Sequence, residues 1–147
     1  MNRELVKDLF LSLLIVLSQL LIFNHINLFG TVSTFIYVSL FILYKTTYDK
    51  TYLILFGFIV GLIIDLSLQT YGAHTLASIT VCYLKERIEK YSFGVNSTLP
   101  LAMIRGTQQT NRVTYFFLII FLHSLIYFSL IFFKFEFALT IFLFTLI

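Results

Sequence analysis

Few side chains in this 147-residue sequence could do chemistry in an apolar setting, and Asp65 is the first of them. It stands near the end of the apolar stretch 51–68, nine residues before His74. A turn at 69–72 would bring the start of the next helix beside Asp65, and N–H groups at a helix start attract a carboxylate. The sequence therefore predicts that Asp65 caps and pins this hairpin, with a protonated His74 as a candidate partner.

Two other roles for Asp65 and His74 stay open. Both side chains could face a partner protein, or Asp65 could belong to a proton or substrate path, as ionisable groups at membrane depth often do. A path needs several buried ionisable groups, and Asp65 is the lone acid expected at that depth. We therefore rank pinning of the hairpin first, partner contact second and translocation third.

The other reactive side chains form no catalytic or metal-binding set. His25, His74 and His123 stand on separate segments without metal-ligand spacing, and Cys82 lies in an apolar run. The sequence has no nucleophile elbow, phosphate-binding glycine loop or paired carboxylates. We therefore predict no enzyme activity, no cofactor and no metal. Cys82 is expected to be buried, and His123 to make a hydrogen bond between helices.

Gly57 and Gly61 stand four residues apart in a G-x-x-x-G pattern, on a broad helix face that also carries Asp65. Small residues at this spacing let helices approach closely in lipid. The sequence predicts a packing face, within the chain in preference to a partner interface.

The elements that position these residues are expected to lie in a membrane. Hydrophobic residues make up 59% of the chain, charged residues only 12%, and proline occurs once. So much apolar surface cannot be hidden in one small soluble core. The formal charge of +3 is too small and scattered to indicate nucleic-acid binding. We predict a single integral membrane domain, residues 1–147.

Six apolar segments are candidates to cross the bilayer, which takes about 17–25 helical residues. The second and fourth are short, and the last has only 11 apolar residues, so it is expected to be short or truncated. The segments are 9–29, 31–44, 51–68, 73–84, 113–133 and 135–147.

Basic residues favour six crossings with the N-terminus in the cytoplasm. In that arrangement nine basic residues lie inside and only Lys134 lies outside, as the positive-inside rule requires. The predicted fold is therefore an all-α, polytopic bundle of six transmembrane helices. The nine residues are Arg3, Lys7, Lys45, Lys50, Lys85, Arg87, Lys90, Arg105 and Arg112.

The one long connection, 85–112, is predicted on the cytoplasmic side. Its first part places Leu84, Ile88 and Tyr91 on one helical face and charged residues on the other. This pattern predicts that the fourth helix continues into the membrane interface.

Residues 56–66 form a glycine-spaced helix ending in Asp65, and residues 72–77 follow after a short turn. This order of features resembles the central signature of the MreD family of bacterial rod-shape-determining proteins. Residues 24–30, 99–101 and 121–123 are similar to versions from Bacteroidetes-like bacteria. The resemblance covers nearly the whole chain, except that family members usually complete a sixth helix.

The resemblance implies a non-enzymatic inner-membrane scaffold of the cell-elongation complex, supporting peptidoglycan synthesis and cell shape. It implies MreC as the direct partner and, through it, MreB, RodA and a penicillin-binding transpeptidase. The candidate packing or partner-contact residues are Gly57, Gly61, Asp65, Gly72 and His74.

Two other classes of function are weaker alternatives. A substrate-binding subunit of a vitamin-type transporter would need a pocket of roughly several hundred Å³ lined by several helices. An isoprenoid-linked transfer enzyme would usually need an acidic cluster for a metal.

Overall fold

The computed structural model describes residues 3–24, 27–28, 32–33, 35–44, 49–94, 107–132 and 138–146, which form helices, one pair of two-residue strands and the turns that join them. In that pair Asn27 lies opposite Ser33 and Leu28 opposite Val32, antiparallel. The elements are α1 (Arg3–Ser18), the π-helix η1 (Gln19–Phe23), β1 (Asn27–Leu28), β2 (Val32–Ser33), the 3₁₀ helix η2 (Ile36–Val38), α2 (Ser39–Leu43), α3 (Lys50–Leu68), α4 (Ala73–Phe93), α5 (Gln109–Phe132) and α6 (Ala138–Leu146).

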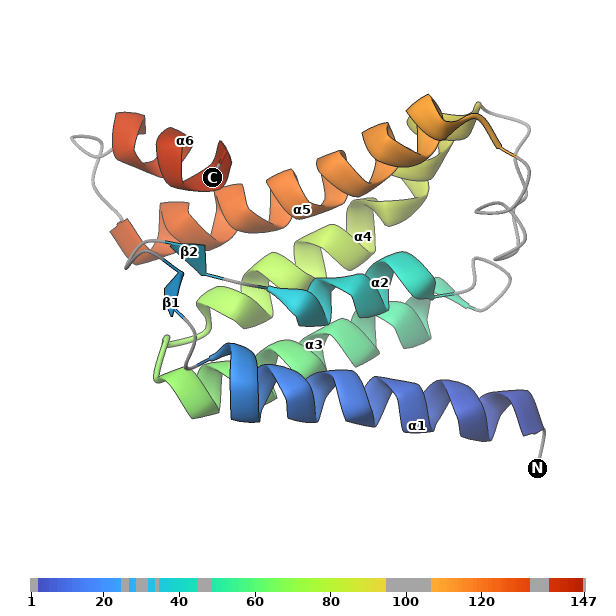
Figure 1. The fold of residues 1–147 in the computed structure, drawn as a ribbon, viewed down its shortest axis with the longest axis horizontal. Helices are drawn as coiled ribbons and strands as arrows, with labels where there is room; N and C mark the ends of the chain where they lie inside the picture. The colour runs from blue at the N-terminus through green and yellow to red at the C-terminus, as the bar shows by residue number, and fades with distance from the viewer. Residues whose placement is uncertain are drawn as a thin grey trace.

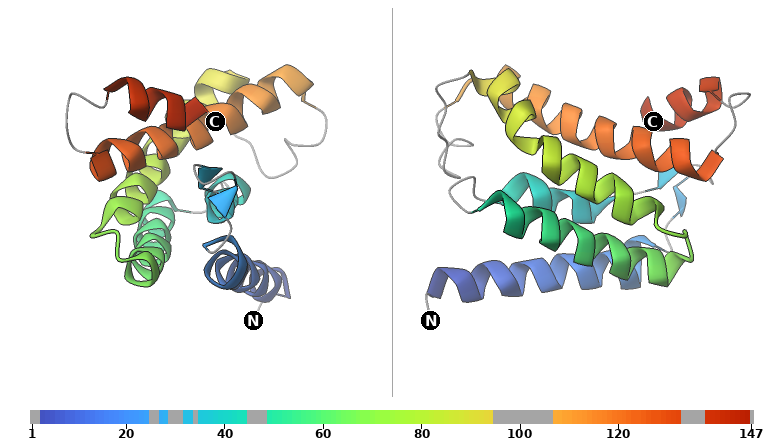
Figure 2. Two further views of the ribbon diagram at one scale, coloured as in Figure 1. Left: turned by 60° about the vertical axis from the view of Figure 1, so that its left-hand side comes forward. Right: turned by 180° about the vertical axis from the view of Figure 1, so that it is seen from behind.

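Successive helices run back and forth along the long axis of the molecule (Figure 1). Helices α3, α4 and α5 pack side by side in chain order, and α6 packs on α5. The short η2–α2 segment lies inside the bundle, with α1 on one side and α4 and α5 on others (Figure 2). The starts of α1, α3 and α5 and the end of α4 lie at one end of the bundle.

Local signals set the helix ends. The Asp49 side chain accepts a hydrogen bond of 2.8 Å from the Thr51 N–H and caps the start of α3. The same contact holds the pKa of the Asp49 carboxyl below its usual value. Gly72 and Gly94 flank α4 with φ of 93° and 98°, a left-handed backbone that glycine adopts without strain.

The interior is built around η2–α2. Tyr37, Val38, Leu40 and Phe41 are all buried, although the segment has only eight residues. They pack with buried apolar side chains of the long helices, among them Leu53, Val60, Ile64, Val81 and Ile119. Of the predicted segment 31–44, only Ile36–Leu43 is helical among the described residues.

The expected all-α fold is confirmed in its coarse form. Two described helices, α3 and α5, are long and apolar enough to cross a membrane. Three other helices are less suited to crossing. Charged residues follow closely on one another in the C-terminal half of α4, and α2 and α6 have only five and nine residues. The six crossings therefore stay a prediction. The predicted connection falls partly on residues 95–106, which lie outside the described residues.

Candidate functional site

The Asp65 carboxylate lies in the turn between α3 and α4 and accepts four hydrogen bonds. Its Oδ1 accepts from the Thr70 hydroxyl at 2.5 Å and from the His74 backbone N–H at 3.0 Å. Its Oδ2 accepts from the Thr75 N–H at 2.8 Å and from the Thr75 hydroxyl at 2.5 Å. Asp65 thus caps the start of α4 from the end of α3, and donors rather than a cation offset its burial.

Asp65 does contact His74, but the predicted pairing with a protonated His74 ring is wrong. Asp65 receives the backbone N–H of His74, while the His74 ring points to the Tyr37 hydroxyl, 2.9 Å from Nδ1. The reason is local geometry: the first N–H groups of α4 and the hydroxyls of Thr70 and Thr75 surround the carboxylate at the end of α3. They satisfy the carboxylate without a second charge.

Replacing Asp65 with asparagine is expected to lower the free energy of unfolding by about 2 kcal/mol, because hydrogen bonds to a charged acceptor are the stronger ones. Asparagine also presents an NH₂ group to donors. Reversible unfolding by SDS in mild-detergent micelles, followed by far-UV circular dichroism, measures the change. Asp49→Asn, at an exposed cap of α3, is the matched control and should cost less. Equal stability of Asp65→Asn and the wild type would refute this assignment.

A second polar cluster joins three elements at the centre of the bundle. The Tyr37 hydroxyl of η2 lies 2.9 Å from Nδ1 of His74 on α4 and 2.6 Å from Nε2 of His123 on α5. All three side chains are 0% exposed. His123 therefore makes an interhelical hydrogen bond, and its partner is a tyrosine.

Proton counting shows what this cluster, called here the His–Tyr–His relay, can do. A tyrosine hydroxyl has one proton, so Tyr37 donates to one ring and accepts from the other. With both rings neutral, two arrangements are possible, and they differ in which nitrogen of each ring carries hydrogen. The outer nitrogens, Nε2 of His74 and Nδ1 of His123, are buried without a hydrogen-bond partner in the described part of the chain.

Aromatic rings enclose the His–Tyr–His relay. Tyr127 stacks on His74 with ring centres 4.3 Å apart, and Phe35 lies 5.1 Å from His123 and 5.5 Å from His74. This packing fixes the ring orientations. The sequence carries no signal for the role of Tyr37, because a tyrosine in an apolar stretch is indistinguishable from a packing or interfacial residue.

A third polar cluster lies toward the other end of α4. The Lys85 ammonium donates to the Glu89 carboxylate and to the Tyr44 carbonyl oxygen, the latter at 3.1 Å. The Tyr115 hydroxyl of α5 donates to Glu89 at 3.2 Å. Lys85 is 2% exposed and Glu89 7%. The cluster joins α4, α5 and Tyr44, the residue that follows α2. The carbonyl groups at the end of a helix such as α2 attract a cation.

This cluster corrects two expectations. Helix α4 does continue to Phe93, but Lys85 and Glu89 of the predicted charged face turn inward, and Tyr91 of the predicted apolar face is 79% exposed. Asp65 is also not the lone buried acid. Burial of Lys85 and Glu89 is tolerated because their charges face each other and Tyr115 adds a donor.

The glycines of α3 lie against α4. A Cβ atom at Gly61 would lie 2.5 Å from Cα of Thr75, and one at Gly57 would lie 2.6 Å from Sγ of Cys82. Both glycines therefore serve close packing within the chain, and Cys82 is buried against this face. Gly72 differs, because a Cβ there meets nothing within 4 Å and only its positive φ calls for glycine.

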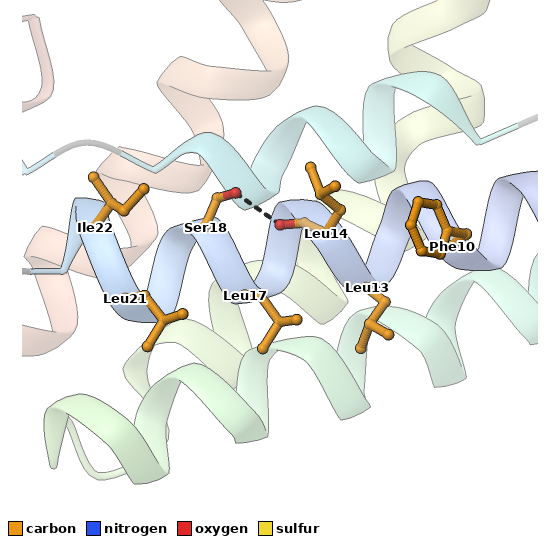
Figure 3. Close-up of a pocket in the computed structure, with 7 residues that line it drawn as sticks. All are labelled: Phe10, Leu13, Leu14, Leu17, Ser18, Leu21 and Ile22. Carbon is orange, nitrogen blue, oxygen red and sulfur yellow. Dashed lines mark hydrogen bonds between the residues drawn. The ribbon is translucent and has the colours of Figure 1, made fainter.

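No group of three or more His, Cys, Asp or Glu side chains that could hold a metal occurs within the described ranges. A hollow on the surface is lined by α1 and η1 alone (Figure 3). Its walls are Phe10, Leu13, Leu14, Leu17, Ser18, Leu21 and Ile22. A hollow with one polar side chain and one helical wall is not the several-helix pocket that the transporter alternative needs.

Comparisons of this chain with protein-family models, with curated proteins and with solved structures gave no match.

Proposed function

We propose that this chain is a non-enzymatic, multi-pass scaffold of the inner membrane that serves a bacterial cell-elongation complex, as the resemblance of residues 24–30 and 56–77 to MreD implies. In this proposal the chain crosses six times with its N-terminus in the cytoplasm. Its direct partner is MreC, and MreB, RodA and a penicillin-binding transpeptidase join through that partner.

The observation that carries the proposal is the one-sided placement of basic residues. Lys7 stands near the start of α1, Lys50 begins α3, Lys90 is in the last turn of α4 and Arg112 is in the first turn of α5, all toward one end of the bundle. Lys50 lies 4.0 Å from Glu86 of α4, which joins the two helices at this end. The arrangement supports a cytoplasmic end by the positive-inside rule.

The face of α1 offers a docking site for a helix of the partner. Phe10, Leu14, Ser18 and Ile22 form one row and Leu13, Leu17 and Leu21 another, with the hollow between them (Figure 3). Rows four residues apart are the ridges that a second helix packs between. Leu21 is 71% exposed and Phe10 67%. Because MreC is bitopic, its single membrane helix is the occupant that we assign to this groove.

Depletion of the protein in its native bacterium tests the biological role. We expect cells to round and swell, because wall synthesis is no longer directed along the cell length, and microscopy of cell width measures this. Reporter fusions within residues 95–106 are expected to show a cytoplasmic location. Normal cell shape with a defect in nutrient uptake would favour the transporter alternative, and a periplasmic reporter would contradict the topology.

Photo-cross-linking tests the docking site. A benzoylphenylalanine at Leu14, in the groove, should give a covalent product with the bitopic partner in living cells. The same residue at Phe117, which is 54% exposed on α5, is the matched control and should give none. Products with lipid alone at both positions would remove α1 as the partner-binding face.

A further inference from the structure

Helix α4 carries a polar face that is buried along nearly its whole length. The residues follow one another at three- or four-residue steps, so they form one stripe on the helix. From His74 to Ser92 the stripe is about 27 Å long at 1.5 Å per residue, close to the roughly 30 Å of a bilayer core. Its members are His74, Ser78, Cys82, Lys85, Glu89 and Ser92, each at most 8% exposed.

Neighbouring elements add polar groups to this stripe, called here the α4 polar face. Near its start, Tyr37 of η2 and His123 of α5 bond with His74 as the His–Tyr–His relay, and Asp65 of α3 binds the backbone there. Toward its end, Tyr115 of α5 bonds to Glu89 and the Tyr44 carbonyl to Lys85. Tyr127 of α5 stacks on His74.

Polar atoms along the stripe lack protein partners in the described residues. They are Nε2 of His74, Nδ1 of His123 and the hydroxyl oxygen of Ser92. Buried polar atoms of this kind are those that internal water satisfies. The stripe therefore contains both groups that exchange protons and points at which water can connect them.

We propose that the α4 polar face is a proton pathway between the two ends of the bundle, with the His–Tyr–His relay as its obligatory step. This activity goes beyond the scaffold role and does not depend on it. From sequence alone, Asp65 has no buried ionisable companions, which weighs against translocation. His123, Tyr37, Lys85 and Glu89 supply them.

The relay step balances as a transfer of one proton. A proton binds Nε2 of His74, the hydrogen on Nδ1 moves to the Tyr37 oxygen, and the Tyr37 hydroxyl hydrogen moves to Nε2 of His123. His123 then releases the hydrogen on its Nδ1. One proton has entered and one has left, with no oxidation or reduction, and both rings have exchanged tautomers. Running the same hydrogen bonds backwards would return the proton, so the starting tautomers are restored by a slower turn of each ring out of its resting orientation, which lets water exchange the hydrogens on its two nitrogens.

Proton flux into liposomes tests the pathway. The purified full-length chain is reconstituted in vesicles of phosphatidylethanolamine and phosphatidylglycerol that contain a pH-sensitive dye. A potassium gradient with valinomycin drives proton entry. We expect the wild-type vesicles to acidify at least about tenfold faster than protein-free vesicles, with a slower rate in heavy water.

Two variants interrupt the relay and one leaves it intact. Tyr37→Phe removes only the central hydroxyl, and His123→Gln keeps a polar side chain that cannot exchange protons. Both should reduce the flux at least about tenfold. Tyr83→Phe is the matched control, since Tyr83 is 50% exposed on α4 and lies outside the α4 polar face, and it should stay within about twofold of wild type. Circular dichroism and gel filtration check that each variant is folded.

The wild-type flux decides first: a rate equal to that of protein-free vesicles overturns the proposal, whatever the variants do. A wild-type flux that survives in folded Tyr37→Phe or His123→Gln also overturns it, because protons then pass elsewhere. If one variant does not fold, the other and the heavy-water rate still decide. Cell-shape measurements are separate, so loss of the scaffold role would leave these results unchanged.

Discussion

Replacing Lys85 with methionine is expected to lower the free energy of unfolding by about 3–5 kcal/mol, because it removes one member of a buried ion pair. The Glu89 carboxylate would lose the ammonium that faces it, and the Tyr44 carbonyl would lose a donor. Methionine matches the length of the lysine stem, so little packing is lost. Unfolding by SDS in mild-detergent micelles, followed by far-UV circular dichroism, measures the loss.

The same helix offers a control for burial. Lys90 pairs with Glu86 at 2.7 Å, also four residues apart, but both side chains are about half exposed. Exposed pairs of this kind contribute little, so Lys90→Met is expected to change stability by at most about 0.5 kcal/mol. If Lys85→Met and Lys90→Met lower the free energy of unfolding equally, Lys85 does not lie in a cluster that excludes water.

A second substitution separates charge from packing. Glu89→Gln in the Lys85→Met background removes the remaining charge but keeps an acceptor for the Tyr115 hydroxyl. We expect the double variant to regain more than half of the stability that Lys85→Met loses, since the cost of the single variant is mainly a buried charge without its counter-charge. Strict additivity of the two losses would contradict this explanation.

Replacing Gly61 with alanine is expected to lower the free energy of unfolding by about 3 kcal/mol, the upper end of the usual cost of overpacking. The added Cβ would lie 2.5 Å from Cα of Thr75 and 2.9 Å from both the Thr75 nitrogen and the His74 oxygen. These are backbone atoms at the start of α4, so relief requires the two helices to separate. Separation would also pull Asp65 from the N–H groups that it binds.

Gly57 provides the control for this prediction. A Cβ there would lie 2.6 Å from the Cys82 sulfur, a side-chain atom, and its next contacts are 3.4 and 3.5 Å. Gly57→Ala should therefore be relieved when Cys82 is also alanine, and the double variant should be no less stable than Cys82→Ala alone. Gly61→Ala should show no such rescue when Thr75 is shortened to alanine. Rescue at Gly61 would mean that side chains, not backbones, set the helix spacing.

Much of the hairpin between α3 and α4 could be predicted from sequence, because its signals are local. Gly57 and Gly61 stand one helical turn apart, Gly72 marks the turn, and Asp65 stands where the start of the next helix must return. Such features depend on residues close in the chain and on backbone geometry that any helix shares. The cap on α4 follows from them without knowledge of the rest of the fold.

The partners of side chains far apart in the chain could not be predicted in this way. Tyr37 and His123 are separated by 86 residues, and their contact requires η2 to enter the bundle beside α5. The charges near the end of α4 show the same limit. Charged residues usually face water, yet the described helix buries Lys85 and Glu89.

By itself, the sequence determined that the chain is helical, that α3 and α4 form a tight glycine-packed hairpin, and that Asp65 holds it. Those outcomes follow from helix periodicity, glycine geometry and the hydrogen-bonding needs of a helix end. Only the tertiary structure decided that Tyr37 joins His74 to His123 and that Lys85 and Glu89 turn inward. A polar group can be buried where distant segments of the chain provide a hydrogen-bond partner, and no local sequence pattern specifies such a contact.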